Sequence, residues 1–139
     1  MSRSRVIARK VQDAQERRTY IPEIFGPLAN TWEFGVLNQF AAMVPEYEGG
    51  AWGIYRLSNG GIYLAPLMDP NEPIKLVVPT NGFSGFVSPD AAGIIASLFS
   101  TNRLVWKYPA RKDLRNLFYK LQDFAYQHAE ACEIARAID

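Results

Sequence analysis

Hydrophobic residues along this chain recur with two different spacings, which predict both helical and extended segments. Between residues 31 and 44 the apolar side chains recur every three or four positions, at Val36, Leu37, Phe40, Ala41 and Val44. This spacing predicts an amphipathic helix, and Pro45 is expected to end it because proline cannot continue helical hydrogen bonding.

The clearest strand signal is a pair of apolar segments, 52–57 and 61–66, on either side of Ser58-Asn59-Gly60. Asn and Gly both tolerate positive φ, which a type I′ hairpin turn requires, so Asn59-Gly60 predicts a two-residue turn. Pairing Ser58 with Gly61 then divides the side chains between two faces. One face carries Tyr55, Leu57, Ile62 and Leu64, and the other carries Trp52, Ile54, Arg56, Tyr63 and Ala65.

Both faces of this hairpin are largely apolar, which leaves two interpretations. The hairpin is a central element covered on two sides, which we favour, or it leaves an aromatic patch for a partner. Further short strands are predicted at 74–78, ended by Pro79, and at 83–87. Together they form a small antiparallel or mixed sheet.

Two more helices follow. Ser88 can cap a helix that begins at Pro89 and Asp90, and an apolar stripe from Ala91 to Phe99 continues it to about Asn102. A helical period then runs from Leu114 to Ile138, about seven turns. The pattern predicts an α+β fold in which a sheet built on the hairpin 52–66 packs with three to four helices, including a long C-terminal helix.

Length and composition indicate one domain with a basic N-terminal arm. The 139 residues are 48% hydrophobic, which suits a single core. Residues 1–18 carry six basic and two acidic side chains, a net charge of +4, while the remainder is −3. We expect residues 1–16 to be an arm, either a frayed terminus or a contact with DNA or an acidic partner, and 17–139 to be the domain.

The overall net charge of +1 argues against two classes of protein. A DNA mimic needs dense negative charge, and a strong nonspecific DNA binder is markedly basic. The basic N-terminus lacks the apolar stretch of a signal peptide, and we find no membrane-spanning run, so a cytoplasmic location is expected.

The sequence offers little for catalysis. The single cysteine, Cys132, and the single histidine, His128, support neither a disulfide nor a zinc site. No phosphate-binding glycine motif is present, and no cofactor or metal is expected. His128 lies on the apolar stripe of the last helix, so a structural role is favoured over a pairing with Cys132 as base and nucleophile. We expect a protein that is not an enzyme.

Several blocks resemble the ArdB/KlcA antirestriction proteins in order and spacing. They are YEGGAW at 47–52, YRLSNGGIYLAP at 55–66, NGF at 81–83, SPDAAGI at 88–94 and the closing AID at 137–139. With Arg17-Arg18 and Phe25-Gly26, the resemblance covers roughly residues 17–139. Two residues depart from the family pattern. Ile62 stands where the family is expected to have an aromatic residue. Ala129 stands where a proline is common after the histidine, which predicts a straighter last helix.

The resemblance implies an α+β protein that is carried by plasmids or other mobile genetic elements. Such a protein relieves type I restriction of unmodified DNA without blocking modification. It also implies a mechanism other than DNA mimicry, with the type I restriction-modification system as a direct or indirect partner. The sequence leaves the oligomeric state open.

The expected interaction surface combines Trp52, Arg56 and Tyr63 on one hairpin face with turn residues Asn59 and Asn81 and the terminal Asp139. Each has an alternative structural role: Trp52 and Tyr63 in the core, Asn59 in its turn, Asp139 as a helix end. Three classes of function remain: a modulator of a restriction complex, a DNA-binding accessory protein that uses the basic arm, and an enzyme built on His128 and Cys132.

Overall fold

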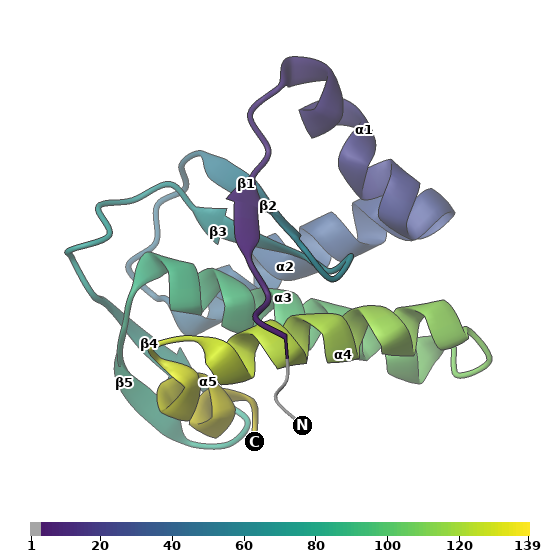
Figure 1. Cartoon of the computed structure of the whole chain (residues 1–139). Coiled ribbons are helices and arrows are strands. Elements are labelled where there is room, and N and C mark those ends of the chain that lie inside the picture. The colour runs from purple at the N-terminus through teal and green to yellow at the C-terminus, as the bar shows by residue number, and fades with distance from the viewer. Residues whose placement is uncertain (1–3) are drawn as a thin grey trace.

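The computed structural model describes residues 4–139, which form an α+β fold with one continuous hydrophobic core (Figure 1). In chain order the elements are β1 (Ala8–Lys10), α1 (Ala14–Phe25), the 3₁₀ turn η1 (Gly26–Leu28), α2 (Ala29–Met43), β2 (Trp52–Leu57), β3 (Ile62–Pro66), β4 (Ile74–Val78), β5 (Phe83–Val87), α3 (Pro89–Lys107), α4 (Lys112–Gln127) and α5 (Ala131–Ile138). No helix formed by these residues is long and apolar enough to cross a membrane.

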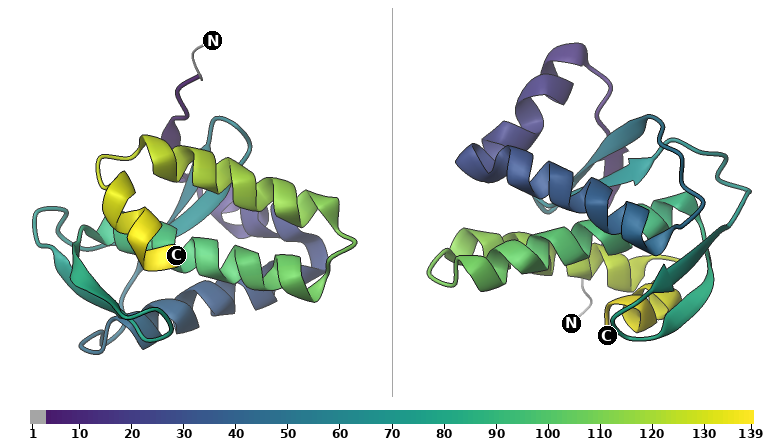
Figure 2. Two further views of the ribbon diagram at one scale, coloured as in Figure 1. Left: turned by 90° about the horizontal axis from the view of Figure 1, so that it is seen from below. Right: turned by 180° about the vertical axis from the view of Figure 1, so that it is seen from behind.

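The hairpin β2–β3 is a central element covered on both faces, which was the favoured interpretation of its two apolar faces. Ile54 and Leu64 form a pair on the face toward α1 and α2. On the other face Tyr63 stacks on Phe124 of α4, and the backbone of Ala65 lies against Gly93 of α3. The right-hand view of Figure 2 shows α2 beside α3, with α1 standing above the sheet.

The predicted two-residue turn is wrong, and the predicted register of the hairpin is shifted by one residue. Arg56 pairs with Ile62, and the Leu57 N–H donates to the Gly61 carbonyl at 3.0 Å, so Ser58, Asn59 and Gly60 form a three-residue turn. Only Gly60 of these three has positive φ, at 91°. The Asn59 amide stabilises this turn, because its Oδ1 accepts from Gly61 N at 3.0 Å. The slip moves Tyr63 to the face of Tyr55 and Leu57.

The N-terminal segment contributes directly to the sheet. Residues 8–10 pair antiparallel with β2, and the Val11 N–H donates to the Ile54 carbonyl at 2.8 Å. Val6 and Val11 are buried in the core. Residues 1–3 of the predicted arm lie outside the described residues.

The hydrophobic pattern did not predict helix α1, because its apolar stripe is weak and Pro22 lies inside the segment, where proline usually argues against a helix. A local signal was nevertheless present. Asp13 caps the helix by accepting from the Glu16 N–H at 2.9 Å, and Asp or Ser followed three residues later by Glu is typical of a helix start.

Helix α3 begins where predicted and lies at the centre of the molecule. Ser88 Oγ accepts from the Ala91 N–H at 3.1 Å, and Ser97 binds the free edge of β3 by accepting from the Leu64 N–H at 3.1 Å. The helix runs to Lys107, beyond the predicted end near Asn102. It continues because Leu104 extends the buried stripe and the first helix breaker is Pro109.

Strands β4 and β5 are confirmed, but they form a separate two-stranded sheet rather than joining the hairpin. The segment between β3 and β4 contains Pro70 and Pro73, which cannot donate ladder hydrogen bonds, and it carries the chain away from β3. One face of this second sheet is buried, with Leu76 and Val78 inside and Phe86 exposed.

The single long C-terminal helix that the pattern predicted is in fact two helices, α4 and α5, and the helix breaks at His128 although Ala129 favoured a straighter helix. His128 has extended backbone, with ψ of 150°, and its ring Nδ1 accepts from the Glu130 N–H at 3.0 Å. The buried residues of the two helices are out of phase along the sequence. Nine residues from Ala125 to Ile134 make about two and a half turns, so Ile134 would lie on the opposite side of an unbroken helix. Figure 1 shows α5 turned away from the end of α4 and beside β5.

Candidate functional site

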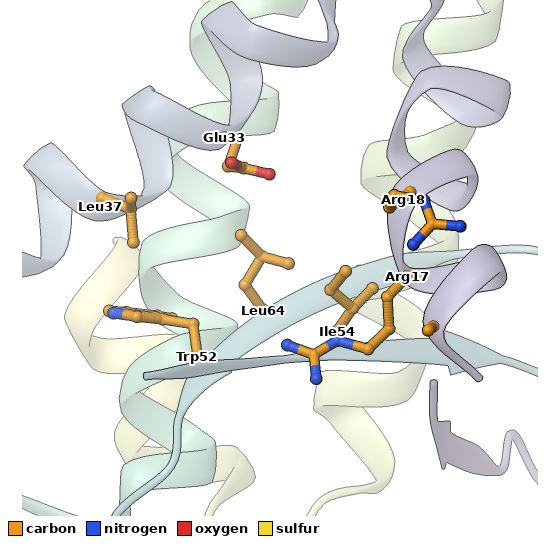
Figure 3. A pocket seen from close by; sticks show the side chains of 8 residues that line it. Arg17, Arg18, Glu33, Leu37, Trp52, Ile54 and Leu64 are labelled. Atoms are coloured by element: carbon orange, nitrogen blue, oxygen red, sulfur yellow. The ribbon is translucent and has the colours of Figure 1, made fainter. Parts of the chain in front are cut away.

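A hollow of about 470 Å³ opens between α1, α2 and the outer face of the hairpin (Figure 3). Its floor is apolar, because the observed register places Ile54 directly opposite Leu64 on this face. Its lining residues are Ala14, Arg17, Arg18, Glu33, Leu37, Trp52, Ile54 and Leu64. An apolar floor with a few polar groups at the edge is typical of a binding pocket.

Three charged side chains surround this floor. Figure 3 shows Arg17 and Arg18 on α1, with Arg17 extending over Ile54, and Glu33 projecting from α2 into the same space. None of the three forms an ion pair with another residue of the range 4–139. The guanidinium groups are therefore free to bind an anion, and the Glu33 carboxylate is free to accept a hydrogen bond from a ligand.

Trp52 forms one end of the hollow and is rigidly held. Its indole Nε1 donates to Tyr47 Oη at 2.7 Å, and its ring packs edge-on against Phe40, with 4.9 Å between ring centroids. The side chain is half-buried. A fixed aromatic wall of this kind can contact an apolar ligand at low entropic cost.

Arg56 lies on the same face as Trp52, but its charge is already engaged. Its Nη1 lies 2.8 Å from the Glu16 carboxylate, and its guanidinium stacks 5.2 Å from the centre of the Tyr20 ring. Arg9 approaches the same carboxylate at 3.3 Å. The hydrogen bond from Arg9, followed by that from Arg56, lowers the pKa of Glu16. These contacts connect α1 to the hairpin.

Tyr63 lies on the opposite face from Trp52 and Arg56, so these three predicted residues do not form one surface. Its hydroxyl donates to Asp90 Oδ1 at 2.8 Å, and its ring stacks on Tyr55 with 4.9 Å between centroids. Burial, together with the Asp90 charge, raises the pKa of Tyr63 far above its ordinary value.

His128 belongs to the same polar cluster. Its Nε2 lies 2.9 Å from Asp90 Oδ2, and the hydrogen bond to Asp90 raises the pKa of His128 despite partial burial. Because Nδ1 accepts from Glu130 N, the neutral ring carries its proton on Nε2 and donates it to Asp90. Both ring nitrogens are occupied, so this arrangement leaves no lone pair to activate a nucleophile.

The remaining groups considered for chemistry do not converge on His128. Cys132 is exposed on α5, on the far side of the helix break. Ser88 Oγ donates to the Glu130 carboxylate and caps α3. Within residues 4–139, no three His, Cys, Asp or Glu side chains are grouped to hold a metal ion.

The two turn asparagines bind the C-terminal helices. Asn59 Nδ2 donates to the Lys120 carbonyl of α4 at 2.9 Å. Asn81 Nδ2 donates to the carbonyls of Ala137 at 2.8 Å and Asp139 at 2.9 Å. Asn81 and Asp139 are thus in direct contact, while Asn59 lies in a separate turn.

Comparison with known proteins assigns the chain to a family. The sequence profile of the family described as antirestriction protein matches residues 45–139, more than half of the chain. The chain belongs to this antirestriction family.

Two relatives extend the similarity through the N-terminal helices. Antirestriction protein KlcA of Escherichia coli is 39% identical over 145 residues, which cover 98% of this chain and 95% of KlcA. A second KlcA of Escherichia coli is 40% identical, over 96% of this chain and 95% of its own. The similarity therefore includes α1 and α2, which lie outside the matched profile.

A solved structure of the KlcA and ArdB proteins has the same fold. It superimposes with a TM-score of 0.87 over 100% of both chains, at 35% sequence identity. Those proteins are described as having a novel fold and antirestriction activity against type I DNA restriction systems in vivo but not in vitro.

The hollow combines one predicted residue with several that the sequence did not single out as an interaction surface. Trp52 was among the expected residues, whereas Arg17, Arg18 and Glu33 were not. Arg17 and Arg18 stood out only as part of the basic segment 1–18 and of the family resemblance, and Glu33 carried no signal. These residues come together because α1 and α2 cross the same face of the hairpin, which local patterns do not reveal.

Proposed function

We propose that this protein acts in the cytoplasm to relieve type I restriction of unmodified incoming DNA, and that it leaves modification largely intact. The observation that carries the proposal is the full-length similarity to KlcA and ArdB, whose activity in vivo is against type I systems. The partner is the type I restriction-modification system, reached directly or through another cellular component.

The proposed mechanism does not involve DNA mimicry or turnover. A net charge of +1 supports this, because a DNA mimic must reproduce the charge of closely spaced phosphates. The engaged nitrogens of His128 offer no general base. The protein would therefore act by binding.

The hollow beneath α1 and α2 is the proposed contact site for that binding. Arg17, Arg18 and Glu33 have no ion-pair partner within residues 4–139, and the floor between them is apolar. Solvated charges beside apolar surface can be desolvated by a complementary partner, which gives specificity. The absence of activity in vitro for KlcA and ArdB supports a partner that exists in the cell but not in a purified restriction assay.

The test is a plating assay with unmodified phage on cells that carry a type I system, with and without this protein. Restored plating is expected, and progeny phage should plate fully on a second restricting strain because their DNA has been modified. Unchanged plating at confirmed soluble expression would reject the proposal. Progeny that stay sensitive would show that modification is blocked as well.

Charge-reversed variants locate the site in the same assay. Arg17→Glu with Arg18→Glu should abolish most of the relief, while Lys75→Glu on β4, which is also exposed, should keep it. Circular dichroism and thermal melting confirm that each variant is folded. Equal relief by all variants would remove the hollow from the mechanism and leave the family function intact.

A second candidate function is a DNA-binding accessory role through the basic N-terminal segment. The exposed Lys10, Arg17 and Arg18 favour it, whereas Arg9 shares Glu16 with Arg56. This function predicts duplex binding that weakens steeply with salt and is lost in the Arg17→Glu, Arg18→Glu variant. Unchanged plating together with such binding would favour this role.

A further inference from the structure

The corner between α3 and α4 carries an indole that packs on very little of the protein. Trp106, in the last turn of α3, is 78% exposed, more than any other large hydrophobic side chain in residues 4–139. An indole is among the costliest side chains to leave in water, because it carries 150–250 Å² of surface that is mostly apolar. Exposed aromatic surface of this kind marks a contact site.

Positive charge is concentrated in the same part of the chain. Residues 91–122 contain six basic residues and one acidic residue, Asp113, a net charge of +5. The rest of the chain contains nine basic and thirteen acidic residues, a net charge of −4. A nearly neutral protein therefore has a strongly basic segment that its total charge conceals.

The basic residues surround Trp106 from two helices. On α3, Arg103 lies three residues before Trp106 and Lys107 directly after it. All three side chains are exposed. Across the turn, Arg111, Lys112 and Arg115 extend the charge along the start of α4. We call residues 103–115 the basic corner. In Figures 1 and 2 the turn between α3 and α4 forms the end of the molecule opposite α5 and the β4–β5 sheet.

Internal contacts account for only part of this charge. Arg111 forms an ion pair with Asp113 at 2.8 Å, Arg115 donates to the Pro109 carbonyl at 2.9 Å, and Arg103 donates to Gln39. Lys112 makes no ion pair within residues 4–139 and opens α4, where a positive charge opposes the helix dipole. Lys112 therefore does not stabilise the helix that it begins.

We propose that the basic corner binds single-stranded nucleic acid, with an unpaired base stacked on Trp106 and phosphates contacting Lys107 and Lys112. Single-strand binders combine positive charge that follows the backbone with aromatic side chains on which bases stack. An acidic protein would also match the charge and could bury the indole, so competition by poly-glutamate is the test that distinguishes it from a single strand. The proposal concerns a surface separate from the hollow and does not depend on the antirestriction assignment.

The experiment measures binding of the full-length protein to a fluorescently labelled oligothymidine by anisotropy, from low to physiological salt. Binding should weaken as salt rises, since each phosphate contact releases counterions. Trp106→Ala should weaken binding roughly tenfold, the loss expected for one stacked base. Lys107→Glu with Lys112→Glu should weaken it further and reduce the slope of affinity against salt.

Two matched variants serve as controls. Phe86→Ala removes an aromatic that is 64% exposed on β5, and Lys75→Glu reverses an exposed charge on β4. Both should bind the oligonucleotide like the parent protein. A duplex of the same length should compete less well than the single strand, because its bases are already stacked.

Three outcomes would overturn the proposal. The first is no binding by the parent protein at low salt. The second is binding that Trp106→Ala leaves unchanged, with poly-glutamate competing as well as the oligonucleotide, which would indicate an acidic protein partner. The third is concentration-dependent dimerisation lost in Trp106→Ala, which would show that a second copy of the chain covers the indole.

Discussion

Asp90 and His128 lie 2.9 Å apart although 38 positions separate them in the sequence. Asp90 is in the first turn of α3, and His128 is the C-cap of α4, so this contact lies at the point where the C-terminal helix breaks. The same carboxylate accepts the Tyr63 hydroxyl at 2.8 Å, which adds the hairpin to the junction. One acidic side chain therefore joins the sheet, α3 and the α4–α5 break.

This contact predicts a stability that depends on pH. The hydrogen bond to Asp90 raises the folded-state pKa of His128 above its ordinary value of 6.5. The contribution of the protonated ring is therefore complete below pH 6.5 and is lost as the pH rises through the folded-state pKa. Urea denaturation should show that the free energy of unfolding falls between about pH 6 and about pH 8, on either side of the ordinary histidine pKa. The decrease should be larger in the parent protein than in His128→Gln.

Asp90→Asn is the matched control for this prediction. The asparagine can still accept from Tyr63, but it carries no charge to favour the imidazolium. This variant should show the same reduced pH dependence as His128→Gln. A pH dependence equal to that of the parent protein in both variants would place its origin in other residues.

The hollow predicts a role for Glu33 that involves charge rather than shape. Glu33→Gln keeps the size of the side chain and removes its negative charge, so a charge-assisted hydrogen bond to a ligand weakens, with roughly a tenfold loss of restriction relief. The melting temperature should be unchanged, because Glu33 forms no ion pair within residues 4–139. Plating efficiency measures the first effect and calorimetry the second. Glu72→Gln, at an exposed position, should keep full relief.

Gly93 predicts a steric limit on the packing of α3 against β3. A Cβ at this position would lie 2.3 Å from the Leu64 carbonyl oxygen and 2.5 Å from Ala65 Cα. Gly93→Ala improves helix propensity by about 1 kcal/mol, but the clash involves backbone and costs about 1–3 kcal/mol or more. Chemical denaturation should therefore show a net loss of stability. Asn102→Ala on the same helix should change stability by less than about 0.5 kcal/mol.

Asn81 predicts a stabilising link between the β4–β5 turn and the end of α5. Its Nδ2 donates to the carbonyls of Ala137 in α5 and of Asp139 just after it, and its Oδ1 accepts from the Phe83 N–H at 2.9 Å. Asn81→Ala should cost about 1 kcal/mol, the usual net contribution of hydrogen bonds at a site that water also reaches. Hydrogen exchange should show faster opening of α5. Asn81→Asp keeps the acceptor for Phe83 but not the donors, so protection of the turn should survive while that of α5 is lost.

The sequence determined those parts of the protein that depend on neighbouring residues. The strands at 74–78 and 83–87 follow from apolar segments between turn residues, and Ser88 caps α3 because its side chain reaches an amide three residues away. The ordered blocks from 47 to 139 also indicated the antirestriction family, which the family profile confirms.

Only the tertiary structure decided how these elements meet. The hairpin register depends on the three-residue turn that Asn59 supports by reaching Lys120 in α4, and a slip of one residue places Tyr63 on the opposite face. At the break, His128 contacts Asp90 in another helix. The hollow needs α1, α2 and two strands in one place. Each is a contact between residues far apart in the chain, and spacing along a sequence carries no record of such contacts.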